Sequence, residues 1–115
     1  MMIVKFFFIS LTLFVAQSAY ATAYYVDSEN GNDSWTGIAP TLSGNSSVVG
    51  PWQTLGRLAA APLLPTDVVY LACGGNWNET LRLNSSGSSG NPIIISAGPN
   101  NCDARPTIDG AMTIP

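Results

Sequence analysis

The stretch that decides the fold is Asp67-Val-Val-Tyr-Leu-Ala-Cys73, and Pro92-Ile-Ile-Ile-Ser-Ala97 echoes it further along the chain. Both are short apolar runs, rich in β-branched residues and bounded by turn residues, which is typical of buried strands. Val69 in the first run and Ile94 in the second are separated by about 25 residues, an interval within the range of structural repeats. The two runs therefore predict equivalent strands in a repeating structure.

A shorter apolar piece follows each of these runs. Thr80-Leu-Arg-Leu83 follows the first and Pro106-Thr-Ile-Asp109 the second, and the interval from Thr80 to Thr107 is nearly the same as that between the runs. A strand, a turn, a second strand and a second turn that recur at such a period are typical of stacked solenoid coils. The predicted fold is mainly β, about two coils with the start of a third at residues 111–115.

The segment before the first coil has a different character. Tyr24–Val26 predicts a short strand, and two stretches rich in Gly, Ser, Asn and Asp, residues 27–37 and 39–51, predict surface loops. Leu55–Ala61 predicts a helix of about two turns, with Thr54 as its N-cap and Pro62 ending it. We expect this helix to cover the open end of the sheet stack.

The first residues have the pattern of an export signal. Lys5 precedes Phe6–Ala16, an almost wholly apolar run that is too short to span a bilayer comfortably. Two overlapping small-x-small sites follow, so cleavage is expected after Ala21 or after Ala23. The alternative is an uncleaved anchor. We expect residues 1–23 to be a signal peptide and the mature protein to be secreted, extracellular or periplasmic.

The charge of the mature chain excludes some partners. Lys5 is the only lysine, so after cleavage three arginines remain against seven carboxylates, a net charge of 3 − 7 = −4. A chain so poor in cations has no electrostatic footprint for nucleic acid or for anionic lipid. We therefore expect neither nucleic acid nor, after signal cleavage, a membrane as a partner, while the oligomeric state stays open.

Two cysteines are the candidates for covalent cross-linking. Cys73 and Cys102 would sit in an exported chain, where disulfides persist. We expect a Cys73–Cys102 bridge, worth about 3 kcal/mol in the chain-entropy model. The alternative is two unpaired thiols. Two cysteines without any histidine make a poor zinc site.

The residues support little catalytic chemistry of their own. Without lysine or histidine the mature chain lacks the usual base for β-elimination, and no histidine-based nucleophile is available. Glu79 and Asp109 could serve as the two carboxylates of a glycosidase, but their separation is longer than the coil period. Asp27 and Asp33 invite a calcium hypothesis, against which a self-bonded turn is favoured. No catalytic, cofactor-binding or metal-binding residue is assigned.

Three tryptophans could stack on sugar rings, although packing beneath loops and against the helix is the commoner fate of such residues. We favour packing for all three, Trp35, Trp52 and Trp77.

The motifs, taken in order, resemble the N-terminal segment of secreted right-handed parallel β-helix proteins of the pectate-lyase-like superfamily. They are Tyr24-Tyr-Val-Asp27, Gly31-Asn-Asp-Ser34 with Gly37, Pro51-Trp-Gln-Thr-Leu55, Asp67-Val-Val-Tyr-Leu71, Asn91-Pro-Ile-Ile-Ile-Ser-Ala97 and Arg105-Pro-Thr-Ile-Asp-Gly110. The resemblance implies that the helix at Leu55 caps a solenoid whose first coil begins at Asp67. It also implies that catalytic and calcium-binding residues lie in later coils, so none is transferred to this chain.

These observations predict residues 24–66 as a strand, loop and capping helix, and residues 67–115 as the first coils of an incomplete β-helix. Because about three coils are needed for stability, we expect a longer protein. The leading hypothesis is the cap of an exported polysaccharide lyase or glycoside hydrolase acting on an acidic polysaccharide. The alternatives are a non-catalytic β-helix adhesin or glycan-binding surface protein, and a free-standing disulfide-linked β domain.

Overall fold

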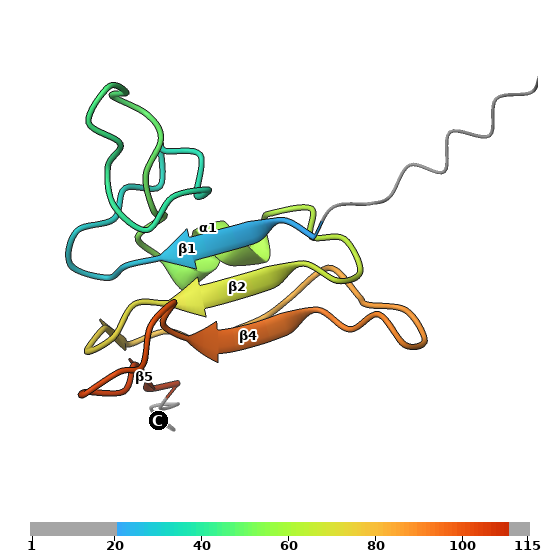
Figure 1. Cartoon of the computed structure of the whole chain (residues 1–115). Coiled ribbons are helices and arrows are strands. Elements are labelled where there is room, and N and C mark those ends of the chain that lie inside the picture. The colour runs from blue at the N-terminus through green and yellow to red at the C-terminus, as the bar shows by residue number, and fades with distance from the viewer. Residues whose placement is uncertain (1–20, 111–115) are drawn as a thin grey trace, which may run out of the picture.

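The computed structural model describes residues 21–110, which form short parallel strands and one short helix (Figure 1). Residues 1–20 of the expected signal peptide and the expected start of a third coil at residues 111–115 lie outside the described residues. The chain order is β1 (Ala23–Val26), α1 (Leu55–Ala59), β2 (Val68–Leu71), β3 (Asn76–Trp77), β4 (Ile94–Ala97) and β5 (Thr107–Ile108). No helix within residues 21–110 is long and apolar enough to cross a membrane.

The larger sheet has the order β1-β2-β4, and both of its strand pairs are parallel. The two runs predicted as equivalent strands are therefore neighbours, and Val69 pairs with Ile95, next to the Ile94 that the sequence comparison had matched with it. Both strands are also shorter than the runs, since β2 ends at Leu71 and β4 begins at Ile94, where the backbone leaves the ladder for turns.

A smaller parallel sheet pairs β3 with β5, Asn76 opposite Thr107 and Trp77 opposite Ile108. The predicted strand at Thr80–Leu83 is wrong, because that segment runs as irregular chain after β3. Its alternation is nevertheless real in packing: Leu81 and Leu83 are half-buried against the core and Arg82 is exposed. The alternation of apolar and polar residues predicted a strand, but this segment makes no hydrogen bonds of a sheet.

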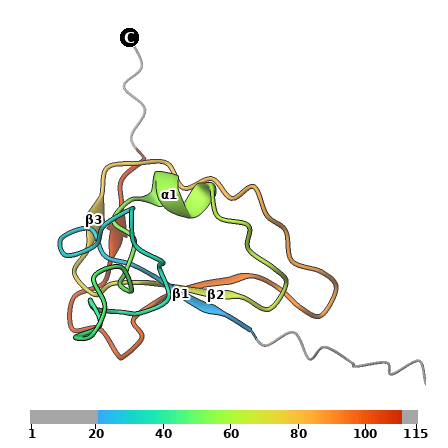
Figure 2. The same ribbon diagram turned by 90° about the horizontal axis from the view of Figure 1, so that it is seen from above.

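Helix α1 is shorter than expected and ends at Ala59, and its N-cap is the predicted Thr54, whose side chain accepts a hydrogen bond from Arg57 N at 3.1 Å. Leu55 and Leu58 face the core and are fully buried. Viewed from above, α1 lies across the interior from β1 and β2 (Figure 2). The helix therefore closes one side of the interior that the sheet closes on the other.

The two edges of the larger sheet differ. At β1, Tyr25 N donates to Gly37 O at 2.8 Å, while Trp52 N donates to Tyr25 O and Asp27 N donates to Trp52 O. The loop between β1 and α1 thus occupies the outer edge of β1, a role that the sequence had assigned to the helix. At the opposite edge, no strand within residues 21–110 pairs with the outer side of β4.

Apolar residues gather on the inner faces of both sheets. Val26, Val69 and Leu71 pack with Leu55 and Leu58 and with two tryptophans in one buried cluster. Because side chains alternate along a strand, the residues between them point outward. Ile94 pairs with Val68 on the outer face and is 48% exposed, and Ile108 in the smaller sheet is 38% exposed.

A buried carboxylate fixes the start of the sheet. Asp67 is only 2% exposed. Its Oδ1 accepts a hydrogen bond from Thr22 N at 3.0 Å and its Oδ2 accepts one from Leu64 N at 2.8 Å. The side chain thereby joins the residue before β1 to the turn before β2, and buried polar groups of this kind need such partners.

We predict that Asp67→Ala lowers the free energy of unfolding by about 3 kcal/mol, because it leaves two backbone donors without their charged acceptor. Asp103→Ala, at an exposed position, is the matched control and should change it by no more than about 0.5 kcal/mol. Chemical denaturation of the secreted protein measures both, and equal losses would refute this role for Asp67.

Candidate functional site

The acidic loop after β1 uses its carboxylates to bind its own backbone. Asp27 Oδ1 accepts hydrogen bonds from Glu29 N at 3.0 Å and from Asn30 N at 3.1 Å, which is the self-bonded turn that the sequence favoured. No group of three or more His, Cys, Asp or Glu side chains placed to hold a metal ion is found among residues 21–110.

Asp33 joins the same loop to the start of α1. Its Oδ1 accepts from Gln53 N at 2.8 Å and Thr54 N at 2.9 Å, and its Oδ2 accepts from the Thr54 hydroxyl at 2.7 Å. Desolvation raises the pKa of Asp33, but the hydrogen bonds from Thr54 and Gln53 and the charge of Arg57 together outweigh it, so the pKa lies below 3.8. These contacts make Asp33 a structural residue.

Of the two carboxylates considered for glycoside hydrolysis, Glu79 binds backbone N–H groups of helix α1. Glu79 reaches the start of α1, where Oε2 accepts from Leu55 N at 3.1 Å and Oε1 from Gly56 N at 3.2 Å. The Asp109 backbone N donates to Trp77 O in the smaller sheet. Glu79 therefore satisfies two helix N–H groups that lack an intrahelical partner.

The tryptophans pack, as the sequence favoured. Trp52 and Trp77 are buried, and their indole N–H groups donate to Trp35 O at 2.8 Å and Gln53 O at 2.9 Å. Tyr24 stacks on Trp52, with ring centroids 5.2 Å apart, and the Arg57 guanidinium carbon lies 4.5 Å from the Trp52 ring centroid. Trp35 is half-buried, with its ring packed against Gly50.

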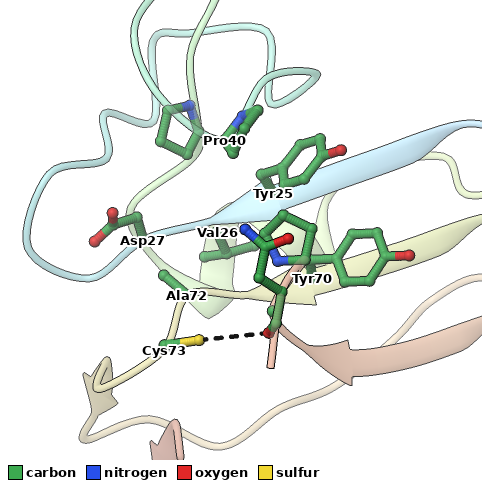
Figure 3. A pocket seen from close by; sticks show the side chains of 11 residues that line it. Tyr25, Val26, Asp27, Pro40, Tyr70, Ala72 and Cys73 are labelled. Atoms are coloured by element: carbon green, nitrogen blue, oxygen red, sulfur yellow. Dashed lines mark hydrogen bonds between the residues drawn. The ribbon is translucent and has the colours of Figure 1, made fainter. Parts of the chain in front are cut away.

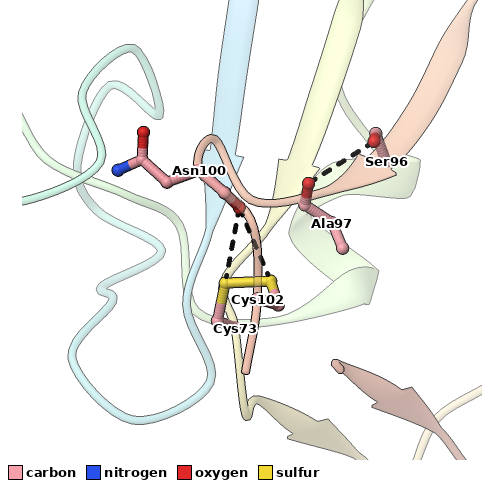
Figure 4. Close-up of a disulfide and its surroundings, with 5 residues drawn as sticks. All are labelled: Cys73, Ser96, Ala97, Asn100 and Cys102. Carbon is pink, nitrogen blue, oxygen red and sulfur yellow. Dashed lines mark hydrogen bonds between the residues drawn. A yellow bond between two sulfur atoms is a disulfide. The ribbon is translucent and has the colours of Figure 1, made fainter. Parts of the chain in front are cut away.

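The expected disulfide is present between Cys73 and Cys102, whose Cα atoms are 5.2 Å apart (Figure 4). It joins the turn after β2 to the loop after β4. Both sulfurs lie 3.8 Å from Asn100 O. Because a disulfide has no S–H group, we treat these two contacts as packing and not as hydrogen bonds.

One pocket of about 210 Å³ lies where the outer face of the larger sheet meets the loops after β1, β2 and β4 (Figure 3). Its lining includes Tyr25 of β1 and Tyr70 of β2, which are paired in register and whose rings stack with centroids 5.6 Å apart. Pro40, Pro99 and Asn100 complete much of the rim.

Sequence analysis did not find this pocket. Tyr25 and Tyr70 each stand one place from an inward residue of a predicted strand, which would have put them outward. The two tyrosines lie side by side because β1 pairs in parallel with β2. The sequence predicted a strand at Tyr24–Val26 but not which strand it would pair with.

Comparison with known proteins gives no matching protein family and no match among curated proteins. The chain is similar to two crystal structures of the GH136 lacto-N-biosidase from Eubacterium ramulus. The native enzyme shares 31% identity over 66% of this chain, with a TM-score of 0.53. The selenomethionine derivative shares 30% identity over 71% of this chain, with a TM-score of 0.55.

These matches span only 11% and 12% of the lacto-N-biosidase chain. The similarity is therefore to a small part of a glycoside hydrolase.

We predict that Asp33 contributes stability that is lost in acid. A carboxyl whose pKa is lowered on folding stabilises the folded state above its unfolded pKa of 3.8 and stops doing so as the pH falls through its folded value. Asp33→Asn should be less stable than the parent near neutral pH, and this difference should shrink as the pH falls.

Melting temperatures recorded from about pH 6 to about pH 3 test this. Asp103→Asn is the control, and its melting temperature should stay close to that of the parent over the whole pH range. An Asp33→Asn difference that is the same at both ends of the range would contradict the assignment.

Proposed function

We propose that this chain is the N-terminal capping segment of an exported, carbohydrate-active right-handed parallel β-helix protein. The observation that carries the proposal is the asymmetry of the larger sheet: loop backbone bonds the outer edge of β1, while β4 presents a free parallel edge within the described residues. An unpaired edge beside half-exposed isoleucines is a template for a further strand.

The capping role follows from how the segment is built. The loop after β1 and helix α1 are tied together by Asp33, and Glu79 ties the helix to the chain after β3. These bonds place polar backbone at one end of the stack and leave apolar surface at the other. A solenoid needs such an end, because each coil buries its apolar face only against a neighbour.

The similarity to part of a lacto-N-biosidase supports a glycoside hydrolase as the whole protein in preference to a polysaccharide lyase. The segment's own acidic side chains Asp33 and Glu79 are engaged in structure. We therefore place the reacting carboxylates in later coils, beyond the described residues.

Hydrogen exchange at the outer edge of β4 tests the capping role. Ile94 N donates to Asp67 O and Gly98 N donates to Leu71 O, so by alternation the N–H groups of Ile95 and Ala97 point away from β2. If a further coil stacks on β4, these two amides should exchange in the full-length protein at least about 100-fold more slowly than unprotected amides.

A truncated chain ending at residue 110 is the comparison, in which the two amides should lose that protection. Fast exchange of Ile95 and Ala97 in the full-length protein would refute the proposal. A sharp, reversible thermal transition of the truncated chain, equal to that of the same region in the longer protein, would refute it as well.

The hydrogen bonds of Thr22 favour one of the two expected signal-peptide cleavage sites. Cleavage after Ala23 would remove Thr22, and with it the Thr22 N bond to Asp67 Oδ1 and the Val68 N bond to Thr22 O. Cleavage after Ala21 keeps both bonds and turns Thr22 N into an ammonium group 3.0 Å from a buried carboxylate. An ion pair of this kind offsets part of the cost of burying the Asp67 charge.

We therefore predict that the secreted protein begins at Thr22. N-terminal sequencing or the intact mass of the secreted protein measures this. A mature chain beginning at Tyr24, or one that retains the apolar leader, would contradict the prediction.

A further inference from the structure

We propose that the pocket beside Tyr25 and Tyr70 binds one ring of a neutral sugar. The inference rests on the proposed carbohydrate-active function and adds a binding site at the capping segment itself.

The pocket is assembled by neighbouring strands and the loops that follow them. Tyr25 and Asp27 come from β1 and its end, Tyr70 and Ala72 from β2 and its end, and Asn100 from the loop after β4. Stacking of the two tyrosine rings fixes each against the other, with an interplanar angle of 25°. The aromatic surface is thus held in place before any ligand arrives.

The backbone of the loop after β4 also approaches this aromatic pair. Gly98 packs beside it, because a Cβ there would lie 3.7 Å from Tyr70 Cδ1. The loop therefore supports the Tyr70 ring from the side of the sheet edge.

The lining has the mixed chemistry that a sugar ring needs. Tyrosine presents an apolar ring with a polar tip, which suits a ligand that has both C–H faces and hydroxyl groups. Pro40 and Pro99 add rigid apolar surface to the rim. Asn100 supplies an amide that can donate and accept hydrogen bonds, and its side chain points away from the disulfide (Figure 4).

Charge selects neutral over acidic sugars. No arginine belongs to the lining, and the Asp27 carboxylate is held at the rim by the amides of Glu29 and Asn30. A uronic acid would bring a second negative charge beside Asp27 with no cation to offset it. Arg105 lines a separate, more open depression beside Cys102 and Pro106.

Size limits the ligand to about one ring. At about 210 Å³ the pocket is smaller than the roughly 300–1,000 Å³ that accommodates drug-sized ligands. A longer oligosaccharide would place one unit here and extend outward over the loops.

Binding to the full-length protein tests the proposal, with lactose and cellobiose as neutral probes and digalacturonate as the acidic probe. Saturation-transfer NMR and titration calorimetry should show binding of at least one neutral disaccharide in preference to digalacturonate. Tyr70→Ala and Tyr25→Ala should each weaken that binding about tenfold. Tyr70→Phe, which keeps the ring, is the matched control and should bind nearly as the parent does.

Three results would overturn the proposal: no binding of either neutral probe, binding that both alanine variants leave unchanged, or a preference for digalacturonate. Equal losses in Tyr70→Phe and Tyr70→Ala would overturn the stacking role. The exchange of Ile95 and Ala97, which tests the capping function, is measured without sugar. Either idea can therefore fail while the other stands.

Discussion

Parallel pairing of β2 with both β1 and β4 is the constraint on which the rest of this structure depends. The register sets Tyr24, Val69 and Ile95 in one row on the inner face, and Val26, Leu71 and Ala97 in another. Parallel strands require crossover connections, and here the crossover from β1 to β2 carries α1, which lies across the interior from both strands (Figure 2), while the crossover from β2 to β4 carries β3. A change of one residue in this register would turn every inward side chain to solvent.

The acidic side chains illustrate how carboxylates can hold together a segment with little regular secondary structure. Asp27, Asp33, Asp67 and Glu79 each accept at least two hydrogen bonds, most of them from backbone N–H groups. Loops and a one-turn helix leave many such donors unpaired, and a short carboxylate is the simplest acceptor for two of them. The negative charge of the segment is thus largely a consequence of its irregular backbone.

Local patterns predicted the parallel repeat, the Thr54 cap, the disulfide and the packed tryptophans, because each depends on neighbouring residues or on a simple spacing. What failed depended on partners distant in the chain. Thr80–Leu83 alternates like a strand, yet it is Asn76–Trp77 that pairs with β5. The Tyr25–Tyr70 pair joins two distant parts of the sequence, through a register that no local signal states.

The disulfide also determines how the segment responds to tension. A pull applied beyond β5 travels back along the chain to Cys102 and crosses the covalent bond directly to Cys73. The intervening chain, which includes β3 and β4, carries no load while the bond is intact. Under force, coils stacked beyond β5 could unfold one after another. The chain between Cys73 and Cys102 would add no length to the extended protein until the disulfide was reduced.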